Sequence, residues 1–285
     1  MKIILTFLFS VLLLLAAGQT SVIRFGLVTD IHNADIPANG SKNYRQSPEK
    51  LQEFVDAMNR YKPDFIIELG DFKDMSQPVS EEKTLGFLRQ IESIFSSSAG
   101  PIYHVLGNHD EDCISKEQFY SIASNTGISK NKTYYSFNCK DVHLIVLDAC
   151  FDSTGRGYSK GNFGWGDSNI PSKEQKWLEK DLKEAKGSVF VFVHQLLDGD
   201  GEAYNVRNAS AIRNILEQSQ KVLAVFQGHY HDGKYNNING IHYYTLKSVV
   251  EGEAPEGNSY AIAELHQDGT LEIKGFRKAV GMVLK

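Results

Sequence analysis

Residues 65–74, FIIELGDFKD, join a run of β-branched and aromatic side chains to a Gly-Asp pair. Such a run is typical of a buried strand, and Gly70 lets the chain turn sharply directly after it. Residues 23–32, IRFGLVTDIH, have the same design, because an apolar run ends there in Asp30 and His32. Buried strands that end in polar side chains indicate an α/β fold built around a sheet.

Helix and strand patterns alternate along the rest of the chain, as expected for α/β units. Residues 134–138 and 142–147 are consecutive predicted strands with a tight connection, so we expect an antiparallel pair and a mixed sheet. Residues 152–171 are rich in Gly, Ser and Asn, and loops this long are commonly functional. The other predicted elements are helices over residues 47–58, 80–95, 172–185 and 209–218, and strands over residues 23–29, 65–69, 102–106, 189–193, 222–226, 241–246, 260–265 and 271–276.

The composition limits which classes of protein the sequence can encode. With 285 residues, 41% of them hydrophobic, the chain can bury a sizeable core. Its 30 basic and 35 acidic residues give a net charge of -5 without any basic run, which argues against duplex nucleic acid as a partner. No internal repeat or linker divides the sequence, so one domain is predicted over residues 19–285. Three cysteines, Cys113, Cys139 and Cys150, allow at most one disulfide.

Residues 1–18 have the pattern of a signal peptide. Lys2 precedes an apolar run, residues 3–17, and the small residues at 16–18 suit a signal peptidase. A membrane anchor is the alternative, but a span takes about 20 apolar residues and this run is shorter. We therefore expect export to the periplasm or the medium, with no stable membrane span after cleavage.

Five polar clusters directly follow predicted strands. The carboxyl ends of neighbouring strands in an α/β sheet open onto one crevice, so these side chains can converge although they are far apart in sequence. Each cluster alone is explained at least as well by a turn, a helix cap or a buried histidine, and only the succession of five favours a common site. The clusters are Asp30-Ile-His32, Gly70-Asp71-Phe-Lys-Asp74, Gly107-Asn108-His109-Asp110, His194 and Gly228-His229-Tyr-His231, whereas His104, His143, His242 and His266 lie inside predicted strands and receive no role.

The ligand chemistry of these clusters favours a pair of transition-metal ions. Carboxylate oxygen, imidazole nitrogen and amide oxygen together suit divalent Mn, Fe or Zn, whereas an all-oxygen set would suit Mg or Ca. Seven ligands exceed one tetrahedral site, and two ions that share a carboxylate can clamp both oxygens of a phosphoryl displacement. The sequence therefore predicts a two-metal site made of Asp30, His32, Asp71, Asn108, His194, His229 and His231.

The order of the clusters, D-x-H, G-D, G-N-H-[DE], H and G-H-x-H, resembles the calcineurin-like metallophosphoesterase superfamily across almost the whole mature chain. The resemblance implies two mixed β-sheets packed face to face and flanked by helices, a four-layer α/β/β/α sandwich. It also implies that Asp71 bridges the two metals. The first metal is then held by Asp30, His32, Asp71 and His231, and the second by Asp71, Asn108, His194 and His229.

Three further segments are similar to the manganese-dependent ADP-ribose/CDP-alcohol diphosphatases within that superfamily. They are residues 44–51, YRQSPEKL, residues 163–178 with FGWG and SKEQKWL, and residues 242–251, HYYTLKSVVE. This branch commonly carries Gln at the position of His32, and purple acid phosphatases, another branch, carry Tyr at the position of Asp74. The narrower resemblance implies hydrolysis of a phosphoester or phosphoanhydride bond in a nucleotide-type diester or diphosphate, such as ADP-ribose or a CDP-alcohol.

Beside the predicted metal site, His109 is expected to stabilise charge or to protonate the leaving oxygen, with Asp110 holding its ring. Other residues are candidate substrate contacts, because aromatic side chains can stack on a base and Arg45 can fork onto a phosphate. The alternative for the aromatic residues is that they pack the long loop against the body of the protein. The candidate contacts are Tyr44, Arg45, Tyr158, Phe163 and Trp165.

Two rival functions fit the same residues. A secreted phosphomonoesterase would need the same two-metal site, and a non-catalytic secreted metal-binding module would keep the ligands without turnover. The presence of His109 and Asp110, which metal binding alone does not need, argues against the second rival. The sequence leaves open the metal pair, the leaving group and the oligomeric state.

Overall fold

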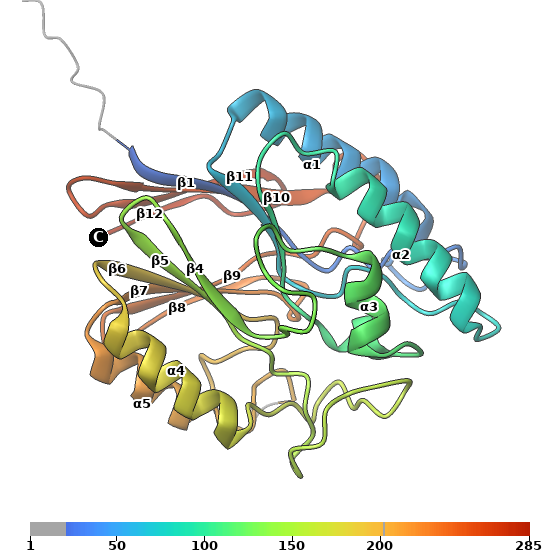
Figure 1. Ribbon diagram of the computed structural model, residues 1–285. Coiled ribbons are helices and arrows are strands. Elements are labelled where there is room, and N and C mark those ends of the chain that lie inside the picture. Colours follow the sequence, from blue (N-terminus) through green and yellow to red (C-terminus); the bar gives the residue numbers. More distant parts are fainter. Residues whose placement is uncertain (1–20, 202) are drawn as a thin grey trace, which may run out of the picture.

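The computed structural model describes residues 21–201 and 203–285. Two six-stranded β-sheets pack face to face, and helices cover their outer faces (Figure 1). This arrangement confirms the predicted sandwich of two mixed sheets flanked by helices. The predicted signal peptide, residues 1–18, lies outside the described residues, so export stays a prediction. Within the described ranges, no helix has the length and apolar character needed to cross a membrane.

The first sheet is mixed because its central strand pairs in both directions. β1 (Ser21–Val28) lies parallel to β2 (Phe65–Glu68) and antiparallel to β10 (Ser259–His266). The other strands are β3 (Ile102–His104), which is parallel to β2, and β11 (Leu271–Arg277) and β12 (Met282–Leu284), which extend the antiparallel side in the order β12-β11-β10-β1-β2-β3.

The second sheet has a parallel centre and antiparallel edges. The predicted antiparallel pair is confirmed as β4 (Tyr135–Cys139) and β5 (Val142–Val146). The order continues with β6 (Ser188–Phe192), β7 (Val222–Gln227) and β9 (Ile241–Thr245), all parallel to β5, and ends with the antiparallel edge strand β8 (Lys234–Ile238).

The helices form the two outer layers (Figure 1). Ser80 caps the helix that follows it, because its hydroxyl accepts a hydrogen bond from the N–H of Lys83, and this satisfies one free donor of the first turn. The first sheet is covered by α1 (Ser47–Tyr61), α2 (Glu81–Phe95) and α3 (Lys116–Ile122), the second by α4 (Ser172–Glu184) and α5 (Ala209–Ser219), and two 3-10 turns are η1 (Tyr44–Gln46) and η2 (Asn108–Glu111).

Five elements were not predicted from the sequence, namely α3, β8, β12 and the two 3-10 turns. α3 has only seven residues, too few for a helical period to show, and it begins with a reciprocal cap between Ser115 and Gln118. β8, KYNNI, is a polar edge strand without an apolar run. Residues 152–171 form no helix or strand, as expected, and none of the three cysteines is paired.

Aromatic side chains fill the space between the sheets. Phe25 of β1 is fully buried, and its ring stacks on that of Phe65 with a centroid distance of 5.1 Å. The edges of Phe192 and Phe226, from the second sheet, contact the same ring at 5.7 and 5.3 Å. The alternation of side chains along β1 therefore joins the two sheets through Phe25.

We predict that Phe25→Ala lowers the free energy of unfolding by about 3–5 kcal/mol, because it leaves a cavity between the two sheets. Urea or guanidinium unfolding, followed by circular dichroism, measures this value. The matched control is Val283→Ala, which removes apolar atoms from a side chain that is 62% exposed and should change stability by less than about 0.5 kcal/mol. Equal effects of the two substitutions would contradict this account of the core.

Candidate metal centre

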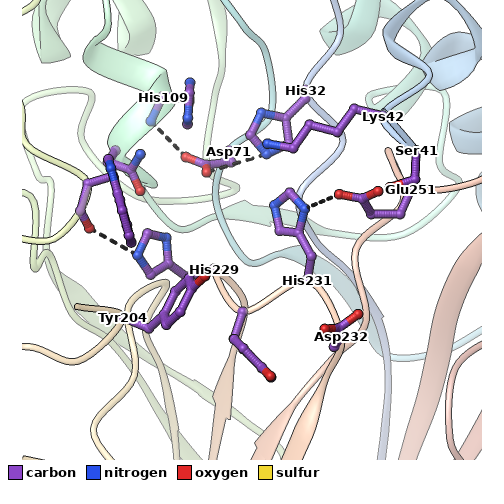
Figure 2. A pocket seen from close by; sticks show the side chains of 13 residues that line it. His32, Ser41, Lys42, Asp71, His109, Tyr204, His229, His231, Asp232 and Glu251 are labelled. Atoms are coloured by element: carbon purple, nitrogen blue, oxygen red, sulfur yellow. Dashed lines mark hydrogen bonds and ion pairs between the residues drawn. The ribbon is translucent and has the colours of Figure 1, made fainter. Parts of the chain in front are cut away.

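The predicted clusters meet at one end of the two sheets. Figure 2 shows the side chains of His32, Asp71, His229 and His231 around a common space. Asp30 and Asp71 follow β1 and β2 of the first sheet, and Asn108 begins η2 after β3. His194 and His229 follow β6 and β7 of the second sheet. The topology therefore brings together the polar groups that the sequence places at strand ends.

Several of these residues have a left-handed backbone, which non-glycine residues rarely adopt. The φ angle is 52° at Asp30, 48° at His32, 58° at Asp71 and 67° at His229. Each such residue costs about 1–3 kcal/mol and persists only where the surroundings hold it. Two backbone hydrogen bonds do so, from Asp30 N to Gly70 O at 3.0 Å and from His32 N to Asp71 O at 2.9 Å. The strained turns direct these side chains into the site.

Asp71 lies between two groups of imidazoles. Its Oδ2 atom is 3.5 Å from Nε2 of His32 and 3.2 Å from Nε2 of His194. On the His32 side, Nε2 of His231 lies 3.3 Å from Oδ1 of Asp30. The ligand atoms lie within 4.8 Å of one another in each of two groups, Asp30 with His32 and His231, and Asp71 with His194 and His229.

In each of these four histidines, the ring nitrogen that faces away from the shared space contacts a partner group outside it. Such partners fix the ring orientation and the tautomer, which leaves the other nitrogen directed at the shared space. The pairs are His231 Nδ1 with Glu251 at 2.7 Å, His194 Nδ1 with the Leu69 carbonyl at 2.8 Å, His229 Nε2 with the Trp165 carbonyl at 3.1 Å, and His32 Nδ1 with Asp74 at 3.3 Å.

Orphaned polar atoms show that this space suits cations. Among the described residues, Nε2 of His32, Nε2 of His194 and both amide atoms of Asn108 are buried without a hydrogen-bond partner. Unsatisfied buried polar atoms cost about 1–3 kcal/mol each, so native structures rarely keep them unless something binds. The donor set, carboxylate with imidazole and amide, fits two divalent ions such as Mn, Fe or Zn that share Asp71.

Mutual electrostatics keep the carboxylates of the site ionised. Burial raises the pKa of Asp71, but the positive field of His194 and neighbouring histidines outweighs it and holds the pKa far below its usual range. Burial likewise raises the pKa of Asp30, and the nearby imidazoles of His231 and His32, 3.3 and 3.9 Å away, more than reverse the effect. Both carboxylates are therefore available as anionic ligands throughout the neutral range.

The contacts of His109 correct one prediction. Its Nδ1 lies 3.2 Å from a carboxylate oxygen of Asp74, and not against Asp110. The Asp110 carboxylate instead accepts the backbone N–H groups of Gly107 at 2.8 Å and of Asp71 and Phe72 at 3.0 Å. Within the turn η2, neighbouring side chains point in different directions, so the residue next in sequence is not the partner of the ring. Asp110 is a structural residue here.

A cavity of about 500 Å³ opens over the cage, and His109 borders it (Figure 2). Of the five candidate substrate contacts, Trp165 lines this cavity. Residues that sequence reasoning missed also line it, because a sequence pattern does not show which way a single side chain points, even for Tyr230 inside the G-H-x-H motif and Glu251 at the end of residues 242–251. These are Ser41, Lys42, Tyr204, Tyr230, Asp232 and Glu251.

The structure places the other four candidates outside the lining of the cavity. Tyr44 is buried in a small apolar cluster, and the Arg45 side chain is 60% exposed and bonds Asp35 at 2.6 Å. The Tyr158 hydroxyl donates to backbone carbonyl oxygens of its own loop, and Phe163 packs on the His109 ring at 5.4 Å. For Tyr158 and Phe163, the alternative of loop packing is therefore the better description.

The fold and the cage together define a metal-dependent phosphoester hydrolase with a site for two divalent ions. A family model described as calcineurin-like phosphoesterase matches residues 23–233, and the chain belongs to this family. It is 24% identical to a protein from Oryza sativa subsp. japonica named manganese-dependent ADP-ribose/CDP-alcohol diphosphatase, over 90% of this chain and 92% of that protein. A human protein of the same name is 21% identical, over 92% of each chain.

A solved structure shows the same fold. The crystal structure of a dimetal phosphatase from Danio rerio has a TM-score of 0.80 at 21% identity and covers 93% of this chain and 99% of that one. Purple acid phosphatase from Lupinus luteus is more distant, with a TM-score of 0.62 at 14% identity, and the match covers 94% of this chain and 53% of that one. At these identities the likeness shows the fold, and the substrate is a separate question.

We predict that Gly107→Ala abolishes binding at the metal site shared through Asp71. A Cβ atom at this position would overlap the backbone nitrogen and the carboxylate of Asp71, so the bridging ligand must move. Metal content by elemental analysis and calorimetry with Mn²⁺ measure the loss. Gly86→Ala is the matched control, since its Cβ would meet nothing within 4 Å and alanine favours the helix. Full metal content in the Gly107 variant would contradict the bridging role of Asp71.

We also predict that Mn²⁺ binds more tightly as the pH rises from 6.5 to 8.5. Burial lowers the pKa of His194, but Asp71 outweighs burial and raises it from 6.5 to about 10. For His231, hydrogen bonds to Asp30 and Glu251 likewise outweigh burial and raise the pKa to about 9. Below these values the imidazoles hold protons that a cation must displace, so affinity should rise about tenfold per pH unit for each proton displaced.

Calorimetry in buffers with different ionisation enthalpies counts these protons directly. The expected result is proton release on Mn²⁺ binding that decreases as the pH approaches 9. Affinity that does not change over this range, without proton release, would contradict the charge state assigned to His194 and His231.

Proposed function

We propose that this protein hydrolyses the diphosphate bond of a nucleotide-type substrate, such as ADP-ribose or a CDP-alcohol, with two divalent cations. The names of its relatives in Oryza sativa and Homo sapiens support this substrate class. The observation that carries the proposal is an aromatic wall beside the metal cage, formed by Trp165 and Tyr204.

The aromatic wall offers a surface for a base. Trp165 is 51% exposed and Tyr204 is 36% exposed, which is unusual for such large side chains, and their ring centroids lie 5.4 Å apart. Both line the cavity of the cage, and the Tyr204 ring lies 5.6 Å from that of His229. An exposed aromatic face can stack on any nucleobase, which is worth about 1–3 kcal/mol for each base. A substrate that carries a base beside its phosphates fits both features.

The chain's own groups would position the reaction. Two bound divalent cations would supply Lewis acidity at the phosphoryl oxygens and activate a water. Asp74 holds Nδ1 of His109, so the other ring nitrogen is free to give a proton to the leaving oxygen. Asp74 also faces Nδ1 of His32, and one carboxylate thus orients both a metal ligand and the proton donor.

A substrate panel with Mn²⁺ tests the proposal. We expect a higher kcat/KM on ADP-ribose and CDP-choline than on p-nitrophenyl phosphate, and loss of all turnover with EDTA. A preference for the monoester would instead identify a phosphomonoesterase. No metal-dependent hydrolysis of any phosphoester would identify a non-catalytic metal-binding module.

We predict that Trp165→Ala lowers kcat/KM for ADP-ribose about tenfold to a hundredfold, because a stacking surface is lost. The same substitution should change kcat/KM for a base-free dialkyl diphosphate by less than about threefold. Tyr235→Ala is the matched control, since Tyr235 is an aromatic residue of β8 that is 39% exposed and lies outside the cavity lining. Equal losses on both substrates would show that Trp165 shapes the cage and does not read the base.

A further inference from the structure

We propose that the ammonium group of Lys42 binds the second phosphate of the substrate, the one that the metal cage does not hold. This inference rests on the proposed function, because only a diphosphate substrate has such a group. It assigns a phosphate subsite next to the cage and makes Lys42 a residue that selects diphosphates over monoesters and simple diesters.

Lys42 is a cation whose charge is left available to a ligand. Its side chain lines the cavity above the cage and extends toward the interior (Figure 2). Within residues 21–201 and 203–285, no carboxylate lies within 4.0 Å of its ammonium and no hydrogen bond from that group is present. Other lysines near the site are engaged, since Lys73 bonds Asp112 and Lys116 bonds Asp148.

The carboxylate that faces Lys42 across a backbone bridge already has a partner. Glu251 lies beside Lys42 through a backbone bridge, but its side chain accepts a hydrogen bond from His231 at 2.7 Å. Glu251 therefore orients His231, a metal ligand. The charge of Lys42 is available to a ligand in the cavity.

The backbone around Lys42 is fixed to the segment that supports the cage. The N–H of Gly252 donates to Ser41 O at 2.7 Å, and the N–H of Asn43 donates to Val250 O at 2.8 Å. The buried ammonium of Lys50 donates to the carbonyls of Val249 and Gly252, each at 2.7 Å. The backbone of Lys42 is thus fixed beside the segment that carries Glu251, the partner of His231.

A cation beside the cage would balance the negative charge of a second phosphate. Two divalent ions can neutralise the phosphoryl group between them, and a monoester carries no further charge. The second phosphate of a diphosphate lies outside the cage and would face Glu251 and Asp232 of the cavity wall without a cation beside it. A charge-assisted contact from Lys42 offsets that repulsion. Tyr204 of the aromatic wall lies beside His229, whereas Lys42 lies on the other side of the cavity, with His32 and His231 (Figure 2).

The test is direct binding to the full-length, manganese-loaded protein, which does not depend on turnover. Calorimetry compares the methylene analogue of ADP-ribose, which has two phosphorus groups and cannot be hydrolysed at the bridge, with AMP, which has one. Lys42→Gln should weaken binding of the analogue about 10- to 100-fold and that of AMP less than about threefold. Lys42→Arg should restore most of the affinity for the analogue, because it keeps the charge.

Arg45→Gln is the matched control, because Arg45 belongs to the same segment but points outward to Asp35. It should change neither affinity. Unchanged binding of the analogue to the Lys42→Gln protein, equal losses for the analogue and AMP, or loss in the Arg45 variant instead would each overturn the inference. If the protein binds the analogue through Lys42 but hydrolyses no diphosphate, the proposed function fails and the phosphate subsite stands.

Discussion

The Asp110 carboxylate accepts the backbone N–H groups of Gly107, Asp71 and Phe72, and so ties the loop after β2 to the loop after β3. Asp71 carries the carboxylate that both imidazole groups share, so the position of its backbone sets the position of both metal sites. A further bond, from the N–H of His32 to the Asp71 carbonyl, connects the loop after β1 to the same residue. Three loops are thus assembled around Asp71 by the chain itself, which is the preorganisation that a two-metal site needs.

This assembly concentrates strain and charge in one place. Asp30 and Asp71 have left-handed backbone angles, which are unfavourable on their own. Some glycines also pack so tightly that an added Cβ atom would collide with the side chain of a metal ligand. These unfavourable features persist because the core stabilises the fold. Phe25 and Phe65 stack between the two sheets, whose inner faces are buried. Local conflicts with the usual rules of backbone and charge are expected at functional sites, and in this protein several of them gather after β1, β2 and β7, at Asp30, Asp71 and His229.

The fold and the convergence of the polar clusters could be predicted because their signals are local. An apolar run, a glycine and a polar residue stand next to one another in the chain, as at residues 65–71, and strand polarity then places each ligand at the same edge. The partner of His109 could not be predicted in this way. Whether Asp110 or Asp74 meets the ring depends on how the four residues of η2 project, and a sequence pattern does not contain that direction.

The directions of the side chains around the cavity could not be predicted from the sequence, for a related physical reason. Arg45 and Lys42 are cations in one irregular segment, and neither helical nor strand periodicity assigns them a side. Their directions are decided by partners elsewhere in the chain, since Glu251 pairs with the backbone at Lys42 while Asp35 draws Arg45 outward. The cage and the wall of its cavity are therefore set by different parts of the chain, because pairings between distant loops, and not the ligand motif, determine which charges and rings border the cavity.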